Sequence, residues 1–121
     1  SLRRMLDPIK EHVDNNFNPL PTEYINEFMP IRQKINDLMK MSCEQIETSR
    51  YENYREILAE ADACKDELSV IRKKHIDRLQ NMKDNTLMQI SLVYLNVLQE
   101  SQEFLSVMRH QLRAAKKFME N

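Results

Sequence analysis

The sequence predicts an all-α fold: an antiparallel up-down bundle of three long helices preceded by one short helix. Two observations support this prediction. The 121 residues include no glycine, whereas the tight turns of β-rich folds normally need glycine for positive φ angles. The chain is also rich in Leu, Met, Glu, Lys, Arg and Gln, which are good helix formers. The length fits a single domain over residues 1–121.

A short amphipathic helix is expected over residues 2–15. Asp7 offers this helix an N-cap, with Pro8 at its first helical position. Residues 15–21, NNFNPLP, combine Asn and Pro without periodicity and therefore predict a loop. Thr22 is expected to cap the next helix, which runs from 23 to about 49, and Pro30 should bend that helix or mark a restart.

Two long helices are indicated by apolar residues that recur at spacings of three and four. The seam of the 23–49 helix consists of Phe28, Ile31, Ile35, Leu38 and Ser42. The helix expected over 52–82 has the cleanest seam, formed by Tyr54, Ile57, Ala61, Cys64, Leu68, Ile71, His75, Leu79 and Met82. A repeat close to seven predicts packing of neighbouring helices at shallow crossing angles.

The last helix is expected over residues 85–119, with Asn85 as its cap. One face carries Leu87, Ser91, Tyr94, Leu98, Ser101, Leu105, Met108, Leu112, Ala115 and Met119. Apolar residues also flank this face in the middle of the helix, so we expect a partner to cover them, either a second copy or the rest of a longer protein. The expected interface residues are Leu92, Val93, Leu95 and Asn96.

Composition excludes several classes of function. A chain without glycine cannot build a Walker-type or dinucleotide-binding loop. The net charge of −1 argues against nucleic acid as a partner, because nucleic-acid modules usually carry a basic excess. No apolar run approaches the ~20 residues of a membrane span, so no direct lipid insertion is expected. Cys43 and Cys64 are interpreted as buried free thiols in a reducing, cytosolic compartment.

Few side chains are candidates for chemistry. His75 lies on an apolar seam, where a histidine is more often a hydrogen-bonded core residue than a ligand. Ser91, Ser101 and Ser106 have no base at a readable position, and helix hydroxyls normally bond the carbonyl one turn earlier. Since no set of nucleophile, base and orienting group can be assembled, we expect that the protein is not an enzyme.

Asp62 and Asp66 form a second candidate site. Aspartate is unfavourable inside a helix, and two like charges one turn apart repel each other, so this pair is unusual. One reading is that they pair with Lys65, Ser69 or a neighbouring helix. The other is a site for a hard cation such as calcium, magnesium or iron. Apart from such a metal, no cofactor is expected.

Residues 91–118, SLVYLNVLQESQEFLSVMRHQLRAAKKF, together with INDLMKMS at 35–42, resemble the cytosolic helical tail of bacterial inorganic-phosphate transporters of the Pit or Na/Pi type. These tails are similar to PhoU domains, which are three-helix units typically doubled into a pseudo-symmetric pair. The resemblance implies a regulatory domain excised from a larger membrane transporter and placed on the cytoplasmic side of the inner membrane. Its implied partners are the transporter's membrane domain and a second copy of the chain.

PhoU proteins carry an acidic-x-x-x-acidic motif that binds a metal cluster. Asp62 and Asp66 match its spacing, whereas in the last helix the motif is reduced to Asn96 followed by Glu100. The resemblance thus makes Asp62, Asp66 and Glu100 candidate metal ligands. Two alternatives to a transporter domain remain open, a generic helical oligomerisation or adaptor module and a metal-binding helical bundle.

Overall fold

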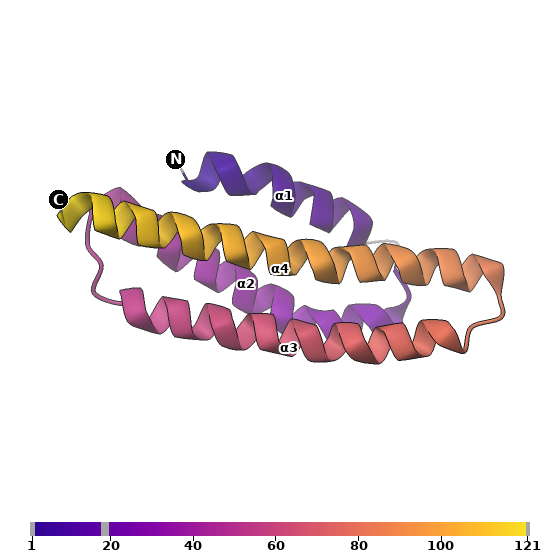
Figure 1. The fold of residues 1–121 in the computed structure, drawn as a ribbon. Helices are drawn as coiled ribbons and strands as arrows, with labels where there is room; N and C mark the ends of the chain where they lie inside the picture. Colours follow the sequence, from indigo (N-terminus) through magenta and orange to yellow (C-terminus); the bar gives the residue numbers. More distant parts are fainter. Residues whose placement is uncertain (1, 18–19, 121) are drawn as a thin grey trace.

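A computed structural model describes residues 2–17 and 20–120. These residues form four helices: α1 (Leu2–Phe17), α2 (Thr22–Thr48), α3 (Tyr54–Gln80) and α4 (Asn85–Glu120) (Figure 1). No strand occurs in the described part of the chain. The prediction of an all-helical protein is therefore confirmed, and the three long helices begin and end within about two residues of their expected bounds, the accuracy with which helix ends are defined.

The helices pack along their lengths. α4 contacts all three others, and α3 packs on α2 and α4. Glu27, near the start of α2, pairs with Arg78 near the end of α3. Lys34, further along α2, pairs with Glu67, which lies earlier on α3. The order of these pairs shows that α2 and α3 run in opposite directions, as successive helices do throughout Figure 1.

α1 begins at Leu2, as expected, and extends two residues beyond its expected end, but the assignment of Asp7 as its N-cap is wrong. The helix begins at Leu2 and continues through Pro8 to Phe17. Leu6 is completely buried and Pro8 is exposed. Burial of Leu2, Leu6 and Val13 on one face stabilises the helix on both sides of the proline, while the proline ring points toward solvent.

The start of α2 also differs from expectation, since Thr22 is its first helical residue and makes no capping bond. Pro21 occupies the N-cap position, and its carbonyl accepts hydrogen bonds from the backbone N–H groups of Tyr24 and Ile25, both at 3.0 Å. α2 continues through Pro30, which is exposed while the seam residues on either side are buried.

α2 ends at Thr48, and the C-cap residue Ser49 that follows has a φ of 54°, in the left-handed region. Glycine usually takes this position because it has no Cβ, but this chain contains none. The N–H groups of Ser49 and Arg50 donate to the carbonyls of Ile46 and Gln45. The last turn of α2 is thereby closed without a glycine.

Asp84, and not Asn85, caps α4. The Asp84 carboxylate accepts a hydrogen bond from the Leu87 N–H at 3.0 Å, and Asn85 is already the first helical residue. Such a side-chain cap typically contributes about 1 kcal/mol to stability.

The core lies between the four helices and contains the predicted seams. Every seam residue named for α2 is buried, as are Ile57, Ala61, Cys64, Leu68 and His75 of α3. On α4 the buried set includes Ser91, Tyr94, Leu98, Ser101, Leu105, Met108 and Leu112, whereas Leu87 and Met119 at its two ends are exposed. α1 packs on α4, and the α4 residues Val97 and Phe104 are buried as well. Part of the apolar surface for which we expected an outside partner is therefore covered from within the chain.

Candidate functional site: a buried polar cluster and the outer side of α3 and α4

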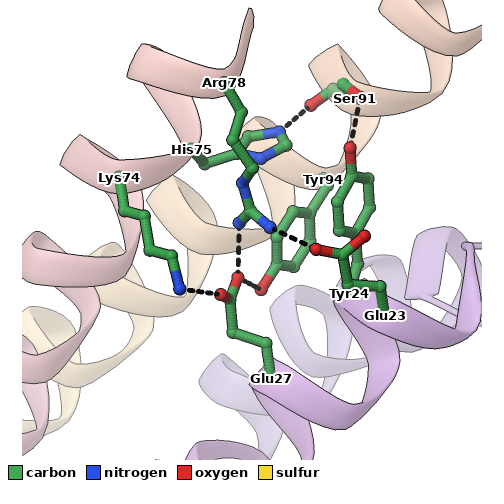
Figure 2. Close-up of polar contacts among 8 residues, drawn as sticks. All are labelled: Glu23, Tyr24, Glu27, Lys74, His75, Arg78, Ser91 and Tyr94. Atoms are coloured by element: carbon green, nitrogen blue, oxygen red, sulfur yellow. Dashed lines mark hydrogen bonds and ion pairs between the residues drawn. The ribbon is translucent and has the colours of Figure 1, made fainter.

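Eight residues form a polar cluster where the start of α2, the end of α3 and the start of α4 meet (Figure 2). They are Glu23, Tyr24 and Glu27 of α2, Lys74, His75 and Arg78 of α3, and Ser91 and Tyr94 of α4. The seam periodicity of each helix turns Tyr24, His75, Ser91 and Tyr94 toward the core, where all four are buried. Buried polar groups are expensive unless they are hydrogen-bonded, so their partners matter.

Three rings form the inner part of the cluster. Tyr24 and Tyr94 stack with their ring centroids 4.6 Å apart and an interplanar angle of 5°. The His75 ring meets both at a steep angle, with centroid distances of 4.9 Å to Tyr24 and 4.8 Å to Tyr94. Stacked and edge-to-face ring pairs stabilise a fold by more than the area they bury accounts for. Here such pairs join three helices at one point.

Hydrogen bonds fix the tautomer of His75. Its Nε2 lies 2.7 Å from the backbone carbonyl oxygen of Ser91. A carbonyl can only accept, so Nε2 carries the hydrogen and Nδ1 carries the lone pair in the neutral ring. Nδ1 is buried and has no hydrogen-bond partner in the described structure. The Ser91 hydroxyl in turn shares a 2.7 Å hydrogen bond with the Tyr24 hydroxyl.

Glu27 neutralises the outer part of the cluster. Its Oε1 accepts hydrogen bonds from the Tyr94 hydroxyl at 2.8 Å and from Arg78 at 2.7 Å, and its Oε2 lies 3.6 Å from the Lys74 Nζ. Arg78 also donates to Glu23 at 3.3 Å and lies over the Tyr24 ring, 5.1 Å from its centroid. One carboxylate therefore connects α2 to both α3 and α4.

These contacts shift the pKa values of the cluster. Burial alone would raise the pKa of Glu27, but the hydrogen bonds from Arg78 and Tyr94 and the nearby cations outweigh burial and hold this pKa below its ordinary value. Burial lowers the pKa of His75, and the charge of Arg78 lowers it further. Burial, together with the bond to Glu27, raises the pKa of Tyr94. At neutral pH the cluster thus contains an ionised Glu27, a neutral His75 and a neutral Tyr94.

The cluster is built to hold three helices together. His75, Ser91 and Tyr94 have no exposed surface, so a substrate cannot touch them in this structure. The interpretation of His75 as a hydrogen-bonded core residue is confirmed. Ser101 bonds the carbonyl of Val97 one turn earlier, as expected, but Ser91 does not follow that rule because Tyr24 takes its hydroxyl.

The three candidate metal ligands lie in different surroundings. Asp62 pairs with Arg109 of α4 at 2.9 Å, Asp66 is exposed, and Glu100 lies 3.1 Å from His12 of α1. Over residues 2–17 and 20–120, no group of three or more His, Cys, Asp or Glu side chains is placed to hold an ion. Asp62 thus pairs with a neighbouring helix, which was the alternative to a cation site.

Both cysteines are buried and free, as the sequence suggested. Burial raises the pKa of the Cys64 thiol to about 11 and raises that of Cys43 as well. The two thiols are therefore protonated at neutral pH, and protonated thiols are poor nucleophiles.

The expected interface residues differ in how far their side chains are exposed. Leu92 is 47% exposed, Leu95 is partly exposed, and Asn96 is exposed. Val93 instead packs against the core. On the outer side, Gln102 of α4 donates to the Ser69 hydroxyl of α3 at 2.7 Å, which marks the line where the two helices meet.

Apolar residues continue along this line. Ile76 lies seven residues after Ser69 and Leu95 seven before Gln102, and seven residues are close to two helical turns. Because α3 and α4 run in opposite directions, both steps lead toward the same end of the molecule. Ile76 is exposed, as is Leu92 one turn beyond Leu95. We call Ile76, Leu92 and Leu95 the outer α3–α4 surface.

Sequence reasoning missed most of the polar cluster. One signal was available for Tyr24, which precedes Phe28 by four residues and extends the apolar stripe of α2. No local signal identifies Glu27 and Arg78 as partners, because 51 residues separate them.

No family model, curated protein or solved structure matches the chain. None of the helices in the described ranges is long and apolar enough to cross a lipid bilayer.

Proposed function

We propose that this chain is a regulatory or interaction domain that acts by helix packing and not by catalysis. The observation that carries the proposal is the outer α3–α4 surface, where the side chains of Ile76 and Leu92 are exposed and that of Leu95 is partly exposed. Contiguous exposed apolar side chains often mark interaction sites. The polar cluster supports the same view, since it links three helices and buries His75, Ser91 and Tyr94.

In its narrower form the proposal is a PhoU-like domain of a bacterial inorganic phosphate transporter, on the cytoplasmic side of the inner membrane. This form rests on the resemblance of residues 91–118 and 35–42 to the tails of such transporters. An antiparallel up-down bundle of α2, α3 and α4, with α1 packed on α4, suits one PhoU-like unit. A single unit would pair with a second copy or with the transporter's membrane domain through the outer α3–α4 surface.

The position of that surface suggests how binding would act on the bundle. Ile76 directly follows His75, and Leu92 directly follows Ser91, so two exposed side chains neighbour the hydrogen bond that joins α3 to α4 in the polar cluster. A partner that moves either helix would strain this bond. Regulation would then consist of a shift between two packings of the same helices.

A generic oligomerisation or adaptor module is the second candidate, because the same apolar surface would serve it equally well. It differs from the first in having no link to phosphate transport. The metal-binding bundle has less support, since Asp62 and Glu100 already have protein partners.

The interaction surface is tested by the Leu95→Asp variant. A carboxylate at this position would have to lose its water when a partner covers it, which is unfavourable. We expect the unchanged protein to sediment as a dimer or larger species at micromolar concentration, and Leu95→Asp to sediment as a monomer with the same helical circular dichroism.

Two further variants complete this experiment. Met29→Asp changes another exposed apolar residue, on α2, and should self-associate like the unchanged protein. Leu92→Asp replaces Leu95→Asp if the latter fails to fold, because Leu92 is the more exposed of the two. A monomeric unchanged protein, or variants on α4 that associate as well as it does, would contradict self-association through this surface.

A further inference from the structure

The last four turns of α4 combine positive charge with exposed apolar groups. Residues 104–119 contain four Lys or Arg residues and no acidic residue, and the helix ends at Glu120. His110, Arg113, Ala114, Lys117 and Phe118 follow spacings of three and four and are all exposed, so they form one stripe on the surface of the helix. Phe118 is 79% exposed, more than any other large apolar residue described, and Met119 beside it is 55% exposed.

Two cations of this stripe are free to attract an anion. Arg109 pairs with Asp62, while Lys116 pairs with Glu120 and also lies over the Tyr54 ring, 5.0 Å from its centroid. Arg113 and Lys117, by contrast, have no ion-pair partner among the residues that the structure describes. Their charges therefore face solvent without a neutralising carboxylate.

The beginning of α1 adds to the same end of the molecule. His12 of α1 pairs with Glu100 of α4, and the two helices run in opposite directions, so the first turn of α1 lies toward the last turns of α4 (Figure 1). Arg4 and Met5 in that first turn are exposed. Exposed residues of α1 thus lie near the stripe of α4, while the end of α2 and the start of α3 bring the exposed acidic residues Glu47 and Glu56 to the same end of the bundle.

We propose that the stripe at the end of α4 docks on an anionic phospholipid surface. Arg113 and Lys117 would attract the negative headgroups, and the Phe118 ring would lie at headgroup level, where aromatic rings are favoured. The combination of basic and apolar groups on one helix stripe is typical of peripheral membrane contact. Nucleic acid is a poorer match, because the whole chain carries a net charge of −1 and the stripe is narrow.

This docking goes beyond the proposed function and does not depend on it. The stripe at the end of α4 is separate from the outer α3–α4 surface, which lies about four turns nearer the start of α4. Contact would be made by side chains at the lipid surface, with every helix remaining outside the bilayer.

Co-sedimentation with vesicles tests the proposal. The protein is mixed with vesicles of phosphatidylcholine alone and with vesicles that also contain phosphatidylglycerol. We expect binding to the anionic vesicles only, weakened by added salt because the attraction is electrostatic. Arg113→Glu/Lys117→Glu should lower the partition coefficient about tenfold or more, since each basic residue near such a surface contributes roughly a fivefold factor. Phe118→Ser should lower it less.

A matched control separates this stripe from net charge alone. Lys73→Glu/Lys83→Glu makes the same change in charge at exposed positions of α3 and the α3–α4 connection, and it should retain most of the binding. Absence of binding, equal binding to neutral vesicles, or an equal loss in this control would each overturn the proposal. Circular dichroism of all variants ensures that folded proteins are compared.

Discussion

The Glu27→Ala variant is expected to lose about 2–3 kcal/mol of unfolding free energy, the cost of leaving charged and buried partners without their hydrogen bonds. Its carboxylate satisfies Arg78 and the buried Tyr94 hydroxyl at the same time. The side chains of Glu27 and Arg78 are only 16% and 22% exposed, so water replaces the lost contacts poorly. Urea denaturation followed by circular dichroism measures the loss.

The exposed ion pair between Lys34 and Glu67 provides the control. Its side chains are 54% and 44% exposed, and ion pairs this exposed contribute little to stability. Glu67→Ala should therefore lower the unfolding free energy much less than Glu27→Ala does. Similar losses in the two variants would show that the polar cluster does not stabilise the bundle in the way described.

Lowering the pH below about 6.5, the ordinary pKa of histidine, is expected to destabilise the protein through His75. The pKa of this ring lies below its ordinary value in the folded state because burial disfavours the charged form. Between the two pKa values the unfolded chain binds a proton that the folded chain does not, so stability falls as the pH falls. The slope from this one group is at most ~1.4 kcal/mol per pH unit.

His75→Gln isolates this contribution. Glutamine keeps a side-chain N–H donor for the Ser91 carbonyl but does not titrate. Urea denaturation at a series of pH values should show that the slope just below pH 6.5 is reduced in His75→Gln and retained in His110→Gln, which changes an exposed histidine of α4. The lowered pKa of Glu27 acts at lower pH, below its ordinary value of 4.5. An unchanged slope in His75→Gln would contradict the assignment of a buried neutral ring.

The helices could be predicted from the sequence because their signal is local and repeated. Apolar residues at spacings of three and four identify α2, α3 and α4 and the buried face of each. The three expected caps, by contrast, were wrong. α1 begins before Asp7 because Leu2 and Leu6 are buried in the core, and the first residues of α2 and α4 were misplaced by one position. The residue at which a helix begins depends on which side chains the neighbouring helices bury and on the backbone conformation of a single residue.

The polar cluster could not be predicted, for a different reason. Tyr24 and Ser91 are 67 residues apart, and the local rule for helix hydroxyls predicted that Ser91 would bond the carbonyl one turn earlier. The same limitation applies to Asp62, whose partner Arg109 is 47 residues away. A spacing of four between carboxylates describes one helix only, whereas the pairing of each carboxylate depends on the neighbouring helix.

Phosphate uptake by cells that produce the transporter proposed to carry this domain tests the central proposal most directly. The proposed function predicts phosphate uptake above that of control cells, and a changed uptake rate when Leu95→Asp is introduced at an unchanged amount of protein in the membrane. The Met29→Asp variant should transport at the original rate. Uptake no greater than that of control cells, or a rate unaffected by Leu95→Asp and by removal of the domain, would contradict a role in regulating phosphate transport.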